Sequence, residues 1–323
     1  MLLAHVQNWL SGKRSDSTQS DPPADDPADA LPSGVMPAAP RETVAAAPIA
    51  PCQHDPAAWP AERIKAAETV WGQGFLAPGG AEEILRLARP LGLSDAVSLL
   101  LVGAGTGGPV YTVAAELSAW VSGFEVDPDF VALATQRGPK AALGRRATIA
   151  TWQPAAPQFR ANAFTHCLAL EPLRFAVATP KLEPTLAAIA AAIKPQGQLM
   201  LVEAVAEAPL EPMDPTVARW LHLERRAIAP PNEATLTRLL GRLGFDVRVV
   251  EDISERHTQQ TLHAWNEAVQ ILRGQSVSRV EARELIAEVE LWLLRLRLIR
   301  TGQMRLLRWH GIGKKGPGVS SAG

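Results

Sequence analysis

The stretch Ser98-Leu99-Leu100-Leu101-Val102-Gly103-Ala104-Gly105-Thr106-Gly107-Gly108 decides the fold of this chain. Its first five residues form a continuous apolar run, which is typical of a strand buried on both faces of a sheet. The glycines that follow let the backbone turn sharply and approach a ligand closely. Residues 108–118 are expected to form a helix whose first turn offers free N–H groups. The stretch therefore predicts a strand, a glycine loop and a helix in succession.

An acidic residue after the next expected strand indicates a nucleoside site. Residues 121–125 form that strand, and Glu125 stands 22 residues after Gly103. A carboxylate in this place can accept hydrogen bonds from both ribose hydroxyls of a bound nucleoside. A glycine loop alone is weak evidence, because any tight strand–helix turn can carry glycines. The loop and Glu125 together favour a nucleoside cofactor, although the same Gly-x-Gly-x-x-Gly pattern also fits an NAD-binding fold.

Along the rest of the chain, expected strands alternate with expected helices. This alternation favours an α/β fold with a parallel sheet and helices on both faces. Further strands are expected at 147–150, 164–170, 197–203 and 245–250. Helices are expected at 61–70, 80–90, 108–118, 128–136, 181–193, 214–226 and 232–243. A mainly helical segment follows at 255–301, and Arg305 to His310 is expected to close the sheet as an antiparallel edge strand.

Three segments outside the glycine loop resemble class I methyltransferases that use S-adenosylmethionine (SAM). Residues 163–171 (AFTHCLALE) resemble their fourth strand, and residues 194–203 (KPQGQLMLVE) resemble the segment that leads into the fifth. Residues 71–80 (WGQGFLAPGG) resemble the N-terminal lid of the phosphoethanolamine and sarcosine/dimethylglycine N-methyltransferase-like group. The resemblance covers about residues 61–252. It implies a Rossmann-like class I sheet, SAM as the cofactor and a small-molecule acceptor methylated at nitrogen or oxygen.

The resemblance also implies which residues contact the cofactor. They come from the glycine loop, the ends of the second and third strands, and the lid: Gly103, Ala104, Gly105, Gly107, Glu125, Val126, Trp152, Gln153, Trp71 and Phe75. Of these, Trp152 is expected to stack on the adenine ring. Gln153 is expected to hydrogen-bond the adenine amine.

Three departures from the family pattern keep a second hypothesis open. Leu101, the Thr151-Trp152-Gln153 region and the Phe164-Thr165 pair stand where the family usually has acidic residues. The loss of three carboxylates is consistent with weak SAM affinity. The glycine loop, Glu125 and the lid favour the first hypothesis, an active methyltransferase. The alternative is a degenerate, non-catalytic binding or scaffold protein, tethered through its N-terminus.

Two glutamates are expected at the acceptor side of the site, because the carboxyl ends of the fourth and fifth strands meet there. Glu171 is the candidate catalytic residue, since an ionised carboxylate can bind an ammonium group or orient a hydroxyl. A structural role as a cap for the turn at Pro172 explains Glu171 equally well. Glu203 ends the fifth expected strand.

Four basic residues are weaker candidates. His166 lies within the fourth expected strand, where a lone histidine is more often packed and hydrogen-bonded than catalytic. His222, Arg225 and Arg226 lie in a segment that commonly forms part of the acceptor pocket in this class, and surface solvation explains them equally well.

The composition divides the chain into five parts. Residues 1–13 are expected to form an amphipathic helix that contacts a membrane surface or a partner, or a frayed end. Residues 14–60, rich in Pro, Ala, Ser and Asp, are expected to be a disordered linker. Residues 61–96 form the helical lid, 97–252 the SAM-binding domain, and 253–323 a helical segment with a final strand and a flexible tail. The helix at 279–300 is apolar around most of its surface, so it packs within its own domain or also forms a homodimer.

Bulk properties argue against several classes of protein. A net charge of −1 gives no basic surplus for binding nucleic acid. Two cysteines provide neither a disulfide framework nor a zinc ligand set, and the seven histidines show no paired spacing for a metal. The sequence contains no run of about 18 apolar residues, so a transmembrane helix is not expected. These features together predict a cytoplasmic protein without a metal.

Overall fold

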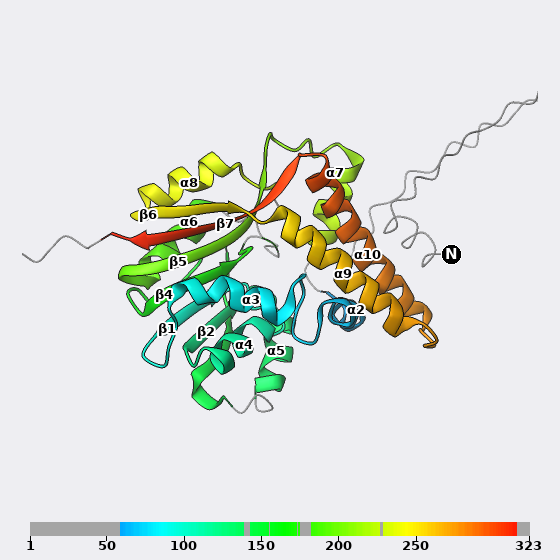
Figure 1. Ribbon diagram of the computed structural model, residues 1–323, viewed down its shortest axis with the longest axis horizontal. Helices are drawn as coiled ribbons and strands as arrows, with labels where there is room; N and C mark the ends of the chain where they lie inside the picture. Colours follow the sequence, from blue (N-terminus) through cyan, green and yellow to red (C-terminus); the bar gives the residue numbers. More distant parts are fainter. Residues whose placement is uncertain are drawn as a thin grey trace, which may run out of the picture. The chain divides into compact units, whose positions relative to one another are not determined.

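A seven-stranded mixed sheet lies at the centre of the computed structural model, which describes residues 59–138, 143–154, 156–172, 174, 182–226 and 229–314 (Figure 1). The strand order is β3-β2-β1-β4-β5-β7-β6. The strands are β1 (Ser98–Val102), β2 (Trp120–Glu125), β3 (Ala147–Thr151), β4 (Phe164–Leu170), β5 (Ile193–Ala206), β6 (Phe245–Asp252) and β7 (Met304–Gly313).

The first five strands form the parallel part of the sheet. β1 pairs with β2 on one side and with β4 on the other, and β3 and β5 extend the parallel pairing outward. The four residues from Leu99 to Val102 have no exposed surface, as expected for a strand that is covered on both faces. Because the strands run parallel, their carboxyl ends meet at one edge, where ligands bind in sheets of this kind.

The last strand, β7, differs in part from the sequence-based expectation. Its antiparallel direction is confirmed, but it is not an edge strand, because it lies between β5 and β6 and pairs antiparallel with both. Leu306, Leu307 and Trp309 are all buried, so neighbouring residues of β7 need cover on both faces. β6 is the edge strand instead, and most of its residues are exposed or half-buried.

The helices follow the expected positions closely. They are α2 (Ala61–Trp71), α3 (Gly80–Ala88), α4 (Gly108–Glu116), α5 (Pro128–Arg137), α6 (Leu182–Ala192), α7 (Pro215–Glu224), α8 (Glu233–Arg242), α9 (Ser254–Leu272) and α10 (Arg279–Arg300). Local chemistry fixes several of their starts. Asp127 caps α5 by accepting from the N–H of Asp129 at 2.9 Å, and Ser278 forms a capping box with Glu281 at the start of α10.

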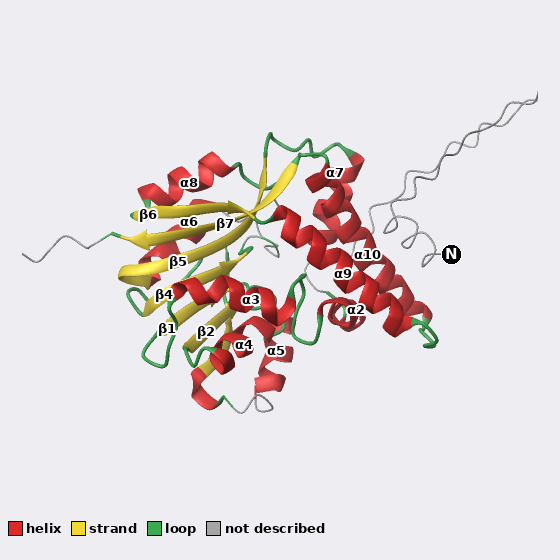
Figure 2. Cartoon of the chain, viewed as in Figure 1, coloured by secondary structure: helices red, strands yellow, loops and turns green. Residues whose placement is uncertain are grey.

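Helices cover both faces of the sheet (Figure 2). On one face, Leu186 of α6 and Leu236 of α8 join Leu100 and Val102 of β1 in a single core cluster. On the other face lie α3, α4 and α5; α4 and α5 pack on β2 and β3, and α3 packs on α4. This layering is that of a Rossmann-like α/β domain.

A second group of helices, α2, α9 and α10, packs together beside the carboxyl edge of the sheet (Figure 1). The expected helical segment at 255–301 is therefore two helices, separated by a turn at residues 273–278. α10 packs against α2, α7 and α9, so much of its wide apolar surface is covered within this chain.

The N-terminal boundary lies slightly earlier than the composition suggests. Trp59, inside the expected linker, is buried and packs edge-on against Phe130 with ring centroids 5.7 Å apart. The expected helix at 1–13, the linker up to residue 58 and the tail from residue 315 lie outside the described residues. Over the described ranges, no helix combines the length and apolar character needed to cross a bilayer.

Candidate cofactor and acceptor site

A pocket of about 850 Å³, partly open to solvent, lies at the carboxyl edge of the sheet. One end, here called the glycine-loop end, is formed by Gly103, Gly105 and Glu125. The other, here called the α9 end, is formed by Glu171, Arg174 and His257. The lid loop that follows α2 borders the pocket and contributes residues 74–78. A single cavity thus joins the glycine loop to the carboxyl end of β4.

Glu125 is held in place by backbone amides. Its Oε2 accepts from the N–H of Gly105 at 2.7 Å, and its Oε1 accepts from the N–H of Val126 at 2.6 Å. Burial raises the pKa of this carboxyl group, and the amide hydrogen bonds oppose that rise. The N–H of Asp127 also lies 3.5 Å from Oε1, and a carboxylate has about four acceptor sites, so a ribose hydroxyl can still be accommodated. The residues at this end therefore fit a nucleoside cofactor.

Gly103 is required by the close approach of β4. Its φ is +86°, and a Cβ atom built on it would lie 2.2 Å from the carbonyl oxygen of Leu170. No side chain fits at that distance, so the backbone of the loop lies directly against the end of β4. This contact brings the glycine-loop end next to Glu171, which follows Leu170 in the chain.

The lid loop contacts the glycine loop through its backbone. The N–H of Gly108 at the start of α4 donates to the carbonyl of Gly74 at 2.9 Å. A Cβ atom on Gly74 would lie 2.9 Å from the Cα of Gly108, so only glycine permits this approach. The loop thus lies over the pocket, where the resemblance to methyltransferase lids placed it.

A glutamate that the sequence reading did not single out fastens the lid. Glu68 of α2 accepts from both Nη atoms of Arg137 at 2.6 and 2.7 Å and from Thr106 Oγ1 at 2.6 Å. The N–H of Gly74 donates to the same carboxylate at 3.1 Å. One side chain therefore ties the lid helix, the lid loop, the glycine loop and α5 together.

Several residues that were expected at the cofactor do not line this pocket. Trp71 donates from its indole to Glu288 Oε1 at 2.6 Å and packs against Trp292, so its role here is in packing. Trp152 is buried in the core cluster against Phe159, with ring centroids 5.5 Å apart. The indole therefore lies in the core and does not line the pocket, and its stacking on adenine stays a prediction.

Some of the remaining predicted cofactor residues line the pocket and others do not. Gln153 is exposed and does not line the pocket, and Val126 packs beside the core cluster. Ala104 is fully buried beneath the loop, and Gly107 serves as the N-cap of α4 with a φ of +103°. The structure brings together Gly103, Gly105, Glu125, Phe75 and Glu171 at the pocket wall.

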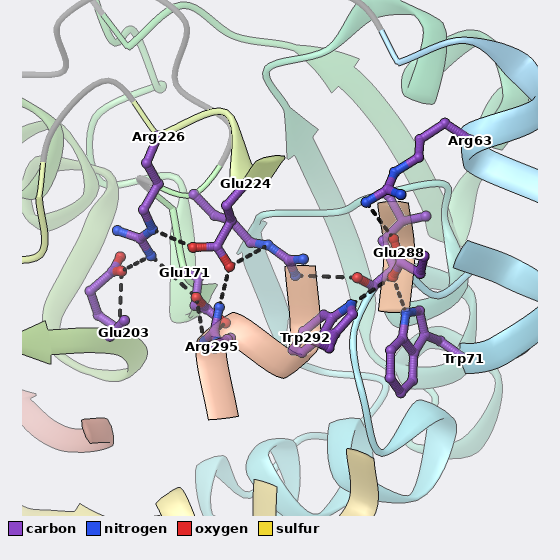
Figure 3. Close-up of polar contacts among 12 residues, drawn as sticks. Arg63, Trp71, Glu171, Glu203, Glu224, Arg226, Glu288, Trp292 and Arg295 are labelled. Atoms are coloured by element: carbon purple, nitrogen blue, oxygen red, sulfur yellow. Dashed lines mark hydrogen bonds and ion pairs between the residues drawn. The ribbon is translucent and has the colours of Figure 1, made fainter. Parts of the chain in front are cut away.

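Glu171 lies in a buried ion-pair cluster (Figure 3). Its two oxygens accept from Arg295 Nη2 at 2.8 and 2.9 Å, and Arg226 Nη2 lies 3.2 Å from Oε2. Burial alone would raise the pKa of this carboxyl, but Arg295, Arg174 and Arg226 outweigh it and hold the pKa at about 2. The expected ionised state is thus present, with arginines as its cause.

This arrangement does not favour the sequence-based interpretation of Glu171 as the group that binds an ammonium acceptor or takes its proton. A carboxyl group with a pKa of about 2 is a weak base, and two guanidinium groups already occupy its oxygens. The alternative of a simple turn cap is incomplete too, because Glu171 connects α10 and the end of α7 to β4. Its φ of +40° is unusual for a residue other than glycine.

The cluster balances its charges. Arg226 also pairs with Glu203 at 2.7 Å and with Glu224 at 2.9 Å, and Glu224 pairs with Arg295. Arg174 lies 3.4 Å from Glu224 and donates to the carbonyl of Leu76 in the lid loop at 3.2 Å. Its positive and negative members are equal in number: Arg174, Arg226, Arg295, Glu171, Glu203 and Glu224.

The weaker basic candidates fall into different places. His166 is packed within β4, and its Nδ1 accepts from the N–H of Gln198 at 2.9 Å, as the sequence reading favoured. Arg225 pairs with Asp127 at 2.9 Å, Arg226 belongs to the buried cluster, and His222 is exposed. Neither His222 nor Arg225 lines the pocket.

Two buried charged residues of α10 were not predicted from the sequence. Glu288 and Arg295 were not among the predicted site residues, and neither has any exposed surface. Glu288 accepts from the indoles of Trp71 and Trp292 and pairs with Arg63 at 2.8 Å (Figure 3). The available signal was their spacing of i, i+4 and i+7 with Trp292, which puts all three on one side of the helix.

Comparisons with solved structures agree with this fold. The chain is similar to phosphoethanolamine N-methyltransferase 2 of Haemonchus contortus in complex with SAM, with a TM-score of 0.67 and 19% identity over 78% of this chain. It spans 57% of that protein's length. A putative sarcosine dimethylglycine methyltransferase from Galdieria sulphuraria matches with a TM-score of 0.62 and 12% identity, covering 78% of this chain and 98% of the other.

The neighbours also include a protein with a different reaction. The [4+2]-cyclase SpnF matches with a TM-score of 0.61 and 19% identity, covering 79% of this chain and 94% of the other. No family profile matches the chain, and no curated protein sequence matches it. Because the identities are 19% or lower, these similarities establish the class I methyltransferase fold and nothing more specific.

Proposed function

We propose that this chain is a SAM-dependent methyltransferase that acts on a small-molecule acceptor. The observation that carries the proposal is the position of Glu125, whose buried carboxylate is held by loop amides at the wall of the pocket beside Gly103 and Gly105. The solved neighbours that bind SAM or S-adenosylhomocysteine in the same fold support it. Neighbours with small-molecule acceptors, such as phosphomonomethylethanolamine and geranyl diphosphate, support the kind of acceptor.

The residues of the chain would each have a limited task. SAM, when bound, supplies a methyl group that is already activated on a sulfonium centre, so the protein mainly aligns the acceptor and excludes water. Glu125 and the backbone of Gly103 and Gly105 would hold the cofactor. Leu76 and the rest of the lid loop would cover it, fastened by Glu68.

Calorimetry with SAM and with S-adenosylhomocysteine tests the proposal directly. The wild-type chain should bind both, and Glu125→Ala should weaken binding by roughly 2–4 kcal/mol, because the hydrogen bonds of its carboxyl group to the cofactor are lost. Glu116→Gln, at an exposed carboxylate of α4, is the matched control and should leave affinity unchanged. Unchanged affinity in folded Glu125→Ala, or no binding by the wild type, would remove the proposal.

The alternative, a degenerate binding or scaffold protein, is favoured by the residues that were expected to contact adenine. Trp152 and Gln153, the residues expected there, lie outside the pocket wall. The two readings differ in what they expect after the cofactor binds: an enzyme releases S-adenosylhomocysteine when an acceptor is added, and a scaffold does not. We also propose a cytoplasmic location, supported by the buried free thiol of Cys167. The homodimer and the contact through residues 1–13 stay predictions from the sequence.

A further inference from the structure

The α9 end of the pocket has mainly apolar walls. Aliphatic side chains from α3, β5, the residue before α9, and β7 surround it: Ile84, Leu87, Val202, Ile253 and Leu306. A surface of this kind binds the apolar part of a ligand most favourably, because both surfaces are then removed from water.

The charged side chains in this wall are already matched by opposite charges. Glu171 pairs with Arg295 and Arg226, and Arg174 is 3.4 Å from Glu224. Glu83, the other carboxylate beside α9, pairs with Arg256 at 3.1 Å and accepts from Gln260 at 2.8 Å. A charged ligand would lose its hydration here and would meet side chains whose charge is already matched by ion-pair partners behind the wall.

His257 is a polar group of this wall with a ring nitrogen that lacks a hydrogen-bond partner. It is 6% exposed, and its Nε2 is buried with no hydrogen bond to any described residue. A buried polar atom left in this state destabilises the protein, so a ligand that supplies the partner recovers that cost. Its ring lies beside Trp292, with ring centroids 5.5 Å apart, which fixes its place in the wall.

The imidazole of His257 is neutral near pH 7. Burial is the main reason that its pKa is lowered to about 3, and the nearby Arg295 and Arg174 lower it while Glu171 acts in the opposite direction. A neutral imidazole does not attract an anion or repel a cation. It forms ordinary hydrogen bonds with uncharged groups such as a hydroxyl.

We propose that the acceptor is an uncharged, largely apolar molecule with a hydroxyl group, and that His257 Nε2 hydrogen-bonds that hydroxyl. The inference rests on the proposed function and deepens it by naming the acceptor class. It separates this chain from neighbours whose acceptor is charged, such as the phosphomonomethylethanolamine bound by one of them. The apolar wall selects the body of the molecule, and His257 orients the reacting end.

Calorimetry on the full chain saturated with S-adenosylhomocysteine tests this with defined probes. The probes are para-butylphenol, butylbenzene as the same body without the hydroxyl, and the charged molecules phosphoethanolamine and dimethylglycine. We expect saturable binding of para-butylphenol and at least tenfold weaker binding of both charged probes. Failure to bind S-adenosylhomocysteine removes the proposed function; normal binding of it with tighter binding of a charged probe, or no binding of para-butylphenol, overturns the acceptor class alone.

Variants of His257 test the hydrogen bond. His257→Phe should weaken para-butylphenol about tenfold and leave butylbenzene and S-adenosylhomocysteine within about twofold, since a tenfold change corresponds to about 1.4 kcal/mol. His257→Gln keeps a hydrogen-bonding group and should recover part of the loss. If His257→Phe weakens para-butylphenol and butylbenzene equally, or weakens neither, the hydrogen bond is wrong.

Discussion

The two ends of the pocket are built in different ways. The glycine-loop end comes from a segment of 23 residues, from Gly103 to Glu125, and is held by backbone hydrogen bonds to a single carboxylate. The α9 end brings together Glu171, Arg174, His257 and Arg295, which are spread over more than a hundred residues, and is held by side-chain ion pairs. The first kind of site depends on backbone geometry, and the second depends on charge balance. Three variants test whether this difference is real.

The largest effect is expected at the α9 end. Glu171→Gln removes a buried negative charge from Arg295 and Arg226, and breaking a buried pair in this way costs about 3–5 kcal/mol of unfolding free energy. Urea unfolding measures the change. Glu183→Gln is the control, because that carboxylate and its partner Arg242 are both more than half exposed, so we expect less than about 0.5 kcal/mol there. Wild-type stability with reduced turnover would restore the catalytic interpretation of Glu171.

A smaller effect is expected at the glycine-loop end. Gly103→Ala should cost about 3 kcal/mol, because the new Cβ meets the carbonyl of Leu170 at 2.2 Å and the backbone has a φ of +86°. Gly92→Ala separates the two causes, since Gly92 has a φ of +61° and no heavy atom within 4 Å of its Cβ position. That control should cost about 1–2 kcal/mol from backbone strain alone. Equal losses in the two variants would show that the close approach to β4 contributes nothing.

The smallest effect is the dependence of stability on pH, measured between about pH 6.5 and 5. The pKa of His257 is about 3 in the folded chain, against 6.5 as its ordinary value. Between these values the unfolded chain binds a proton that the folded chain does not, so stability is lost as pH falls below about 6.5. The slope from one such group reaches about 1.4 kcal/mol per pH unit.

His257→Phe should therefore reduce the slope of unfolding free energy against pH between about 6.5 and 5, and the lowered pKa values of His166 and His310 should keep part of it. His263→Phe, at an exposed histidine of the same helix, should leave the slope as in the wild type. Below about pH 4.5 both variants should still lose stability, because the lowered pKa of Glu171 acts there. A wild-type slope in His257→Phe would mean that His257 is charged in the folded chain.

Much of the sheet was predictable because its signals are local. The apolar run of β1, the glycines after it and the distance to Glu125 are properties of neighbouring residues, and β1 has the bounds that were predicted. The end of β2 at Glu125 was predicted for the same reason. The place of β7 was not, because the order of strands depends on how distant segments pair.

The sequence by itself determined the class of fold, the glycine loop and the position of the carboxylate at the end of β2, because short-range periodicity and spacing encode them. Only the tertiary structure decided what surrounds Glu171 and His257. Arg174 and Arg295 have ordinary neighbours in the sequence, and burial beside charged groups shifts their pKa values. The pKa of a side chain depends on charges that lie close in space, and no local pattern in the chain specifies which ones those are.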